Sequence, residues 1–459
     1  MRPLLKKPDA DPNNMKNFRP VSNLPTIDKL LEQVVSSRLD DHLQSEDLHD
    51  TYQSAYRKFH STETALLKLH ADITQALDQG LHVVVITLDL SAAFDTVDHQ
   101  ILLQRLHDLF GLSGDALGWM ASYFLDRAQS VVIGEKTSSE VKLDSGVPQG
   151  SVLGPKCYSM YTKPVGALIK KHGMSYIIYA DDSDTYLVIK PSVPWSNTAS
   201  KLQACLSDIQ AWMSQNLLKL NMDKTELIVF APKQNGTCPQ RSLQIGDCTV
   251  VEGDCIKSLG VNFDKHLSMD RQVNATIRTC YHNIRTIGKI RRYISDDACK
   301  TLIQSLVISR LDYANALYIG LPKSMLHRLQ LVQHSAARVI THTSRREHIT
   351  PVLYALHWLP VEQRVKYKVL LHVFKALNDQ GPVYIKDMIK LYQPTRALRS
   401  ASQNLLVVPK ARHATYGNRS FKTVAAKLWN NLPSSLRCAT ELQRFKSSLK
   451  TVLFREHYD

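Results

Sequence analysis

The sequence lacks the features that mark membrane-spanning proteins, secreted proteins and proteins stabilised by disulfides or zinc. No run of about eighteen apolar residues occurs in the 459-residue chain, which argues against a transmembrane helix. The first residues, MRPLLKKPDADPNN, contain no apolar stretch of the kind found in signal peptides. The eight cysteines are scattered and never form a CxxC pair, so neither a disulfide framework nor a zinc site is indicated. These absences favour a soluble intracellular protein, nuclear or cytoplasmic, without a membrane partner.

What is present is a chain long enough for two or three domains, with its charge divided unevenly along the sequence. Residues 1–263 contain 25 basic and 30 acidic residues, a net charge of −5. Residues 264–459 contain 32 basic and 12 acidic residues, a net charge of +20. So large a contrast predicts a polyanionic partner for the second part, and nucleic acid is the leading candidate.

The first 265 residues alternate between helical and strand patterns, which predicts an α+β fold with a mostly antiparallel sheet. The run HVVVITLDL (82–90) is rich in β-branched residues, as is typical of a central strand buried on both faces. The segment TIDKLLEQVVSSRLDDHL (26–43) predicts a helix with one buried apolar face, formed by Ile27, Leu30, Leu31, Val34 and Val35.

Strand patterns stop after about residue 266, and the remaining chain is expected to be helical and basic. The predicted helix 268–293 has an apolar seam at Val273, Ile277, Cys280, Ile284 and Ile287. A separate row on the same helix consists of Arg271, Arg278, Arg285, Lys289 and Arg292. The helix 360–377 repeats the arrangement with Arg364, Lys368, His372 and Lys375. Each row alone is compatible with a solvated basic face, but two rows in a +20 region favour contacts with a nucleic-acid backbone.

The stretch YADD (179–182) places two adjacent carboxylates, Asp181 and Asp182, at the turn of a predicted hairpin. Taken alone, the pair is read more simply as a polar turn. The alternative is a divalent-cation site, which needs a third carboxylate, and Asp89 at the end of the central strand can supply it. Such a site could hold two Mg²⁺ ions and support nucleotide addition.

The order of motifs resembles the palm of a reverse transcriptase of the non-LTR (LINE-type) retrotransposon family. The similar stretches are NFRPVSNLPTIDKLLEQVV, QSAYRKFHSTETALL, LDLSAAFDTVDH, GVPQGSVLGP, YADD, LNMDKTELIVF and IKSLGVNFD. The resemblance implies a right-hand polymerase, with fingers and palm over 1–265, a helical thumb over 266–345 and a basic helical C-terminal region over 346–459. It also implies an RNA template, a DNA primer and dNTPs as partners, and Mg²⁺, with Mn²⁺ as an alternative, as cofactor.

The same resemblance assigns roles to individual residues. Asp89, Asp181 and Asp182 would hold the metal ions together with the main-chain carbonyl of Leu90, and Lys224 would protonate pyrophosphate. Arg57 would face the triphosphate, Phe94 would exclude a ribose 2′-OH, and Gln149 and Gly150 would lie beneath the nascent base pair. The row on helix 268–293 would grip the primer–template duplex.

The chain also departs from the family pattern. Lys156 and Cys157 stand where relatives usually carry leucines, so the helix after GVPQGSVLGP is expected to pack less well. Because the sequence begins near the fingers, we expect no N-terminal endonuclease of the kind that such elements normally carry. A catalytically decayed, RNA-binding remnant of a retroelement is therefore an alternative function. An RNA-dependent RNA polymerase is a third, which Phe94 disfavours.

Overall fold

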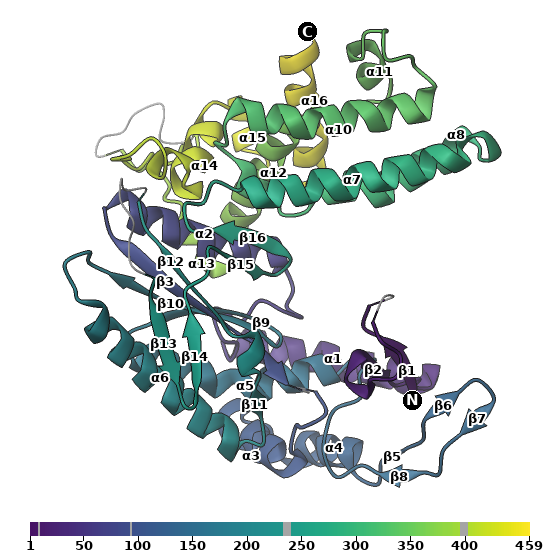
Figure 1. Ribbon diagram of the computed structural model, residues 1–459, viewed down its shortest axis with the longest axis vertical. Helices are drawn as coiled ribbons and strands as arrows, with labels where there is room; N and C mark the ends of the chain where they lie inside the picture. Colours follow the sequence, from purple (N-terminus) through teal and green to yellow (C-terminus); the bar gives the residue numbers. More distant parts are fainter. Residues whose placement is uncertain (8–9, 92–93, 233–239, 395–402) are drawn as a thin grey trace.

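The computed structural model describes residues 1–459 except 8–9, 92–93, 233–239 and 395–402 (Figure 1). In Figure 1 the C-terminal helices form the upper part of the molecule, and the helices α3 (His99–Phe110) and α4 (Gly114–Phe124) lie in the lower part. The central sheet lies between them. This arrangement agrees with the expected right-hand polymerase fold of palm, fingers and thumb. No helix of the described chain is long and apolar enough to cross a membrane.

The central sheet has four antiparallel strands in the order β12 (Glu226–Phe230), β3 (His82–Leu88), β10 (Asp182–Ile189) and β9 (Ser175–Tyr179). The prediction of a buried central strand is confirmed, because β3 lies between β12 and β10 and is almost entirely buried. Alternate side chains of β3 enter different cores: Val83 and Val85 pack on one face of the sheet, and Val84, Ile86 and Leu88 on the other. A strand buried on both faces needs this continuous apolar run.

The other strands form two-stranded ladders. They pair as β1 (Arg2–Leu5) with β2 (Phe18–Val21), β4 (Leu90–Ser91) with β11 (Lys219–Leu220), β5 (Ala128–Gln129) with β8 (Val141–Lys142), β6 (Val132–Ile133) with β7 (Lys136–Thr137), β13 (Ser242–Ile245) with β14 (Cys248–Val251), and β15 (Cys255–Ser258) with β16 (Val261–Asp264).

Helices cover both faces of the sheet. On the face of Val84 and Ile86, the core is completed by α3, α5 (Gly154–Lys171) and α6 (Trp195–Gln215). On the other face lies α2 (Thr62–Asp78), which begins with a capping box between Ser61 and Thr64 and is buried along most of its length. The mixed fold with an antiparallel sheet is therefore as predicted.

The predicted burial of helix α1 (Thr26–Ser45) is wrong for four of its five apolar residues, and only Val35 is half-buried against the core. Its apolar residues Ile27, Leu30, Leu31 and Val34 are between 53% and 63% exposed. The buried side of α1 carries instead Glu32, Ser36, Leu39 and Leu43. Helical periodicity shows that one face is apolar, but it does not show what covers that face.

The prediction that Lys156 would weaken the packing of α5 is also wrong. Its ammonium group donates to the carbonyl oxygen of Ser36 at 3.0 Å and forms an ion pair with Asp40 at 2.5 Å, so it joins α5 to α1. Cys157 is fully buried in the core. Both departures from the family pattern are accommodated.

After β16, the described residues form helices and no strand longer than an isolated bridge, as expected. The helices are α7 (Asp270–Ile290), α8 (Asp296–Ile303), α9 (Ser309–Asp312), α10 (Lys323–Thr341), α11 (Thr350–Ala355), α12 (Val361–Leu377), α13 (Val383–Lys386), α14 (Phe421–Asn430), α15 (Ser434–Arg437) and α16 (Leu442–Tyr458), with a π-helical turn at Gln304–Ile308. They share one core with α2, and this core crosses the predicted boundary at residue 345. The three-part division of the chain stays a prediction.

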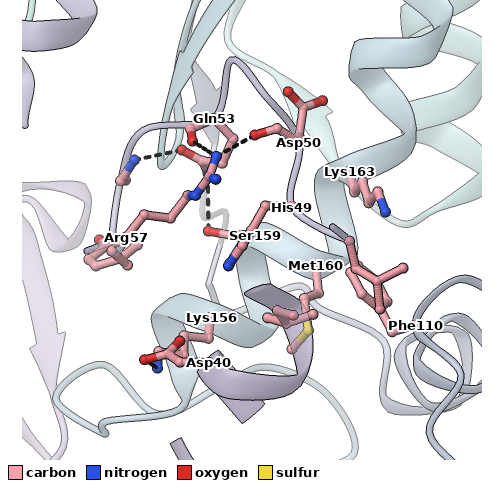
Figure 2. A pocket seen from close by; sticks show the side chains of 14 residues that line it. Asp40, His49, Asp50, Gln53, Arg57, Phe110, Lys156, Ser159, Met160 and Lys163 are labelled. Atoms are coloured by element: carbon pink, nitrogen blue, oxygen red, sulfur yellow. Dashed lines mark hydrogen bonds and ion pairs between the residues drawn. The ribbon is translucent and has the colours of Figure 1, made fainter. Parts of the chain in front are cut away.

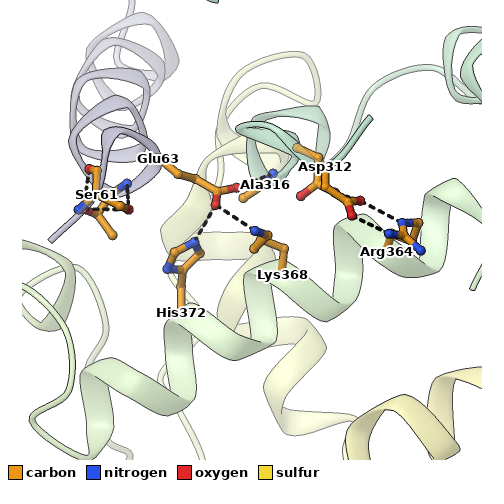
Figure 3. A network of polar contacts seen from close by, with 9 residues as sticks. Ser61, Glu63, Asp312, Ala316, Arg364, Lys368 and His372 are labelled. Atoms are coloured by element: carbon orange, nitrogen blue, oxygen red, sulfur yellow. Dashed lines mark hydrogen bonds and ion pairs between the residues drawn. The ribbon is translucent and has the colours of Figure 1, made fainter. Parts of the chain in front are cut away.

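Buried ion pairs join α12 to the rest of the protein (Figure 3). The Glu63 carboxylate at the start of α2 lies 3.3 Å from the Lys368 ammonium group and 3.4 Å from the His372 ring, and it accepts the Ala316 N–H at 3.1 Å. Arg364 binds Asp312 through two hydrogen bonds. Three of the four residues of the α12 basic row therefore hold the fold together, and the prediction of a row free for phosphate is wrong.

Burial alone would raise the pKa of Glu63, but the hydrogen bond and charge of His372 and the charge of Lys368 hold that pKa below its usual value. We expect Glu63→Gln to lower the free energy of unfolding by about 3 kcal/mol, because the Lys368 ammonium group and the buried Ala316 N–H lose a charged partner. Urea denaturation at pH 7 measures this loss. Glu362→Gln, which breaks an exposed ion pair with Lys366 on the same helix, should cost less than about 0.5 kcal/mol. Equal effects of the two substitutions would contradict a structural role for Glu63.

Candidate active site

The YADD turn lies at the end of the central sheet. Tyr179 pairs with Asp182, so Ala180 and Asp181 form a two-residue hairpin turn, as the sequence predicts. Ala180 has φ of +59°, a left-handed conformation that favours glycine and that this tight turn requires at its first position. The turn lifts the Asp181 side chain away from the buried part of the hairpin, where it is half-exposed.

Strand register places Asp89 opposite Asp182. The ladder of β3 and β10 ends with Leu88 opposite Ser183, and one step further along both strands brings Asp89 to Asp182. Residues directly opposite in antiparallel strands have Cβ atoms roughly 4.5–5.5 Å apart. Two carboxylates facing each other in this way repel unless a positive charge lies between or beside them.

That positive charge belongs to Lys224 in the present structure. Glu226 pairs with Thr87, so the register brings Lys224 to the other side of Asp89. The Lys224 ammonium group lies 2.9 Å from the Asp89 carboxylate, which also accepts a hydrogen bond from the Asn221 amide at 3.3 Å. Asp89 is therefore flanked by an aspartate and a lysine. The sequence did not predict this ion pair.

Desolvation and repulsion act together on the pKa of Asp182. Desolvation in the cleft, followed by the charges of Asp181 and Asp89, raises the pKa of Asp182 to about 6, against an opposing effect of Lys224. The Tyr158 hydroxyl is buried nearby without a hydrogen-bond partner in the described chain. Burial and the charge of Asp181 raise the pKa of Tyr158 well above its usual value. Nothing in the sequence spacing singled out Tyr158.

A large cleft of about 1250 Å³ opens over these residues. It brings together most of the residues that the family resemblance implied, namely Asp89, Phe94, Gln149, Gly150, Asp181, Asp182 and Lys224, and it adds Arg19, Tyr56 and Asn221, which the sequence analysis did not assign. These residues come from segments far apart in the chain. The strand ends and the loops that follow them form the floor of the cleft.

Phe94 and Gln149 are fixed by their neighbours. The Phe94 ring stacks on Tyr158, with ring centres 4.8 Å apart. The Gln149 amide donates to the Asp95 carboxylate at 3.2 Å. Gly150 has φ of +116°, and a Cβ atom there would lie 2.9 Å from the Ser22 carbonyl oxygen, so only glycine fits. Leu90 lies in β4, where its backbone pairs with Leu220; its side chain is outside the described residues, and its carbonyl as a metal ligand stays a prediction.

Arg57 lies outside the cleft. Figure 2 shows it in a neighbouring pocket, where its guanidinium group donates to the carbonyl oxygens of Asp50 at 2.6 Å and Gln53 at 3.0 Å. The same pocket contains Lys156 and Lys163. Burial lowers the pKa of Arg57, whose guanidinium group is hydrogen-bonded to these two carbonyl oxygens. This arrangement gives no support to a contact between Arg57 and a triphosphate.

The acidic residues line one cleft without forming a closed metal centre. In the part of the chain that the structure describes, no three His, Cys, Asp or Glu side chains are gathered closely enough to hold an ion. Asp89 is instead committed to Lys224. The donor set nevertheless suits a hard divalent cation, because it consists of carboxylates whose mutual repulsion a cation would relieve. Lys224 and Asn221 both contact the Oδ2 atom of Asp89, so Lys224 would compete with an ion for that oxygen.

The basic row of α7 is exposed as predicted. Arg271, Arg278, Arg285, Lys289 and Arg292 all lie on the surface, while Val273, Cys280, Ile284 and Ile287 are buried and Ile277 is half-buried. Arg278, Arg285 and Lys289 form no ion pair with any described residue. In Figure 1 α7 lies in the upper part of the molecule, above the hairpin of β15 and β16. The exposed row is open to an anionic ligand on this surface.

Sequence comparison places the chain in a family. Residues 5–263 match the reverse transcriptase (RNA-dependent DNA polymerase) family, a segment that contains every residue lining the cleft. The chain belongs to this family. The motif resemblance noted in the sequence is thereby confirmed.

Relatives among curated proteins come from mobile elements. The probable RNA-directed DNA polymerase from transposon BS of Drosophila melanogaster is 27% identical over 348 residues, which cover 74% of this chain and 38% of the relative. The RNA-directed DNA polymerase from mobile element jockey of the same species is 25% identical over 74% of this chain and 37% of the relative. The chain thus spans well under half the length of these relatives. A solved telomerase from Candida tropicalis is 10% identical, with a TM-score of 0.41, over 95% of this chain and 57% of that chain.

The raised pKa of Asp182 predicts a stability effect. Its pKa of about 6 in the fold exceeds the usual 3.8, so the unfolded state loses this proton first. The resulting penalty on the folded state is absent below pH 3.8 and complete above pH 6. In EDTA at pH 8, Asp182→Asn should therefore melt at a higher temperature than the unaltered protein, and the difference should shrink as the pH falls towards 4. Asp41→Asn, an exposed position on α1, should not change the melting temperature at either pH. A lower melting temperature for Asp182→Asn at pH 8 would contradict the electrostatic account.

Proposed function

We propose that this protein is the RNA-directed DNA polymerase part of a non-LTR retrotransposon, which adds deoxynucleotides to a primer 3′ end on an RNA template. The observation that carries the proposal is the register of the central sheet, which brings Asp89 opposite Asp182 at the floor of a cleft that also contains Phe94 and Gln149. Membership of the reverse transcriptase family supports the reaction class.

The acidic residues and Lys224 would share the chemistry. Asp89, Asp181, Asp182 and the carbonyl of Leu90 would hold two Mg²⁺ ions, which when bound activate the primer hydroxyl and stabilise the leaving pyrophosphate. Lys224 also lines the cleft, so once released from Asp89 its ammonium group could turn towards the phosphates and donate a proton to the leaving group. The ion pair with Asp89 thus keeps Lys224 beside the reacting atoms before the substrate binds.

The neighbouring residues would select the substrate. Phe94 stacks on Tyr158 at the edge of the cleft, and its ring would occupy the space that a ribose 2′-OH needs. Gln149 would hydrogen-bond the incoming nucleotide, and the missing side chain of Gly150 leaves room for close approach. The RNA-polymerase alternative is disfavoured by Phe94. The decayed-remnant alternative loses its main support, because Lys156 and Cys157 are well accommodated.

Primer extension tests the function directly. On poly(rA)/oligo(dT) with Mg²⁺, the unaltered protein should add dTMP, and Asp181→Asn should lose nucleotide addition because a ligand charge is removed. RNA binding by the variant, measured by fluorescence anisotropy, should be unchanged. Retained polymerisation by Asp181→Asn would show that the reacting site lies elsewhere, and RNA binding without any polymerisation by the unaltered protein would favour the remnant.

Phe94 predicts the choice of sugar. Phe94→Val should raise the incorporation of ribonucleotides relative to deoxyribonucleotides by at least about tenfold, because the smaller side chain no longer meets the 2′-OH. The two rates are compared on one template with rATP or dATP. If the ratio stays unchanged in a variant that still polymerises, Phe94 is a packing residue on Tyr158.

The basic row on α7 predicts that the affinity for primer–template depends on the salt concentration. Arg278→Gln combined with Arg285→Gln should weaken primer–template binding with little sequence dependence, because each phosphate contact releases condensed counterions. The slope of log K against log[salt] should fall by about one to two units. The matched control is Arg364→Gln on α12, whose guanidinium already binds Asp312 and should leave the salt slope unchanged. An unchanged affinity and slope in the double variant would reduce the row to a solvated face.

A further inference from the structure

Glu32 is a buried carboxylate without a part in the chemistry described above. It projects from the buried side of α1, with 2% of its surface exposed. Its Oε2 atom accepts the N–H of Val152 at 2.6 Å and the N–H of Leu153 at 3.0 Å. Its Oε1 atom is buried without a hydrogen-bond partner in the described chain. Burying a carboxylate with one unpartnered oxygen carries a desolvation cost, which the two N–H contacts offset only in part.

The two N–H groups that Glu32 binds follow the substrate loop directly. Val152 and Leu153 come two and three residues after Gly150, at the point where the chain enters α5. Unsatisfied N–H groups at the start of a helix attract an anion, and here the anion is supplied by a different helix. Glu32 therefore fixes the C-terminal end of the loop relative to α1.

The same N-terminal segment holds the other end of the loop. The Ser22 N–H donates to the Gln149 carbonyl oxygen at 2.8 Å, and the Ser22 carbonyl lies so close to Gly150 that a Cβ atom would clash. Ser22 and Glu32 thus contact the loop on both sides of Gly150. The loop position is set by α1 and its leading segment rather than by the loop residues alone.

We propose that Glu32 is a positioning residue for nucleotide selection. Its carboxylate holds the loop of Gln149 and Gly150 in one position beneath the nascent base pair. This inference rests on the proposed function, because it gives the loop its substrate. Glu32 does not reach the cleft, so it acts only through the loop that it holds. A loop free to shift would accept mismatched pairs more readily and would bind the correct nucleotide less tightly.

Three variants separate this role from simple stabilisation. Glu32→Gln keeps the size of the side chain and one acceptor oxygen but removes the charge. Glu32→Asp keeps the charge but shortens the side chain by one methylene. Asp41→Asn is a matched control on the exposed side of α1. For Glu32→Gln on poly(rA)/oligo(dT), we expect KM for dTTP to rise about tenfold, as fits the loss of a charge-assisted hydrogen bond. Turnover per active site and primer–template affinity should stay within twofold. Mismatch incorporation should rise, and Glu32→Asp should fall between Glu32→Gln and the unaltered protein.

A second measurement does not depend on catalysis. Amide hydrogen exchange of the 150–156 segment should speed up about tenfold in Glu32→Gln and remain unchanged in Asp41→Asn. A lower melting temperature with unchanged KM and mismatch ratio would overturn the proposal and leave Glu32 a stabilising residue. If the unaltered protein adds no nucleotide, the proposed function fails, and the role of Glu32 in nucleotide selection is overturned with it. Faster exchange in Glu32→Gln would then still show that Glu32 anchors the loop. Unchanged exchange in Glu32→Gln would show that Glu32 does not hold the loop in place.

Discussion

The repulsion between Asp89 and Asp182 at the end of strands β3 and β10 is the constraint around which the cleft is built. Register fixes these two carboxylates opposite each other, because β3 is held between two neighbours and its side chains belong to two different cores. A shift by one residue would exchange the core-facing side chains of Val83–Leu88, so the sheet cannot slide to relieve the repulsion. The site must supply positive charge instead, and in this structure Lys224 does so from the other side of Asp89.

The helical C-terminal region gives this sheet a firm support. It wraps α2, which lies against the face of the sheet that carries Val83 and Val85, and the buried Glu63 network ties α12 to the start of α2. Arg364, Lys368 and His372 of α12 take part in internal contacts, whereas the basic row of α7 is exposed. Of the +20 net charge in this part of the chain, only a portion is therefore free to meet nucleic acid.

Sequence reasoning succeeded where the local pattern decides the structure. A β-branched run identifies β3 because few other structures bury such a run on both faces, and the seam of α7 follows from helical periodicity. It failed where a distant segment decides. The apolar face of α1 points outward, while the buried side carries Glu32, which contacts the loop before α5. In the same way, the partners of Arg364 and Lys156 lie in other helices, and nothing in the sequence near these residues indicates them.

The central claim is that Asp89 exchanges Lys224 for metal when substrate binds. A structure of the protein with primer–template, a non-hydrolysable deoxynucleotide and Mn²⁺ tests it most directly, because anomalous scattering locates the ions. The account predicts two ions roughly 3.5–4 Å apart, each coordinated by at least one of Asp89, Asp181 and Asp182, with the Lys224 ammonium group moved from Asp89 towards the phosphates. Ions bound away from these carboxylates, or an Asp89–Lys224 ion pair that persists beside a bound nucleotide, would contradict it.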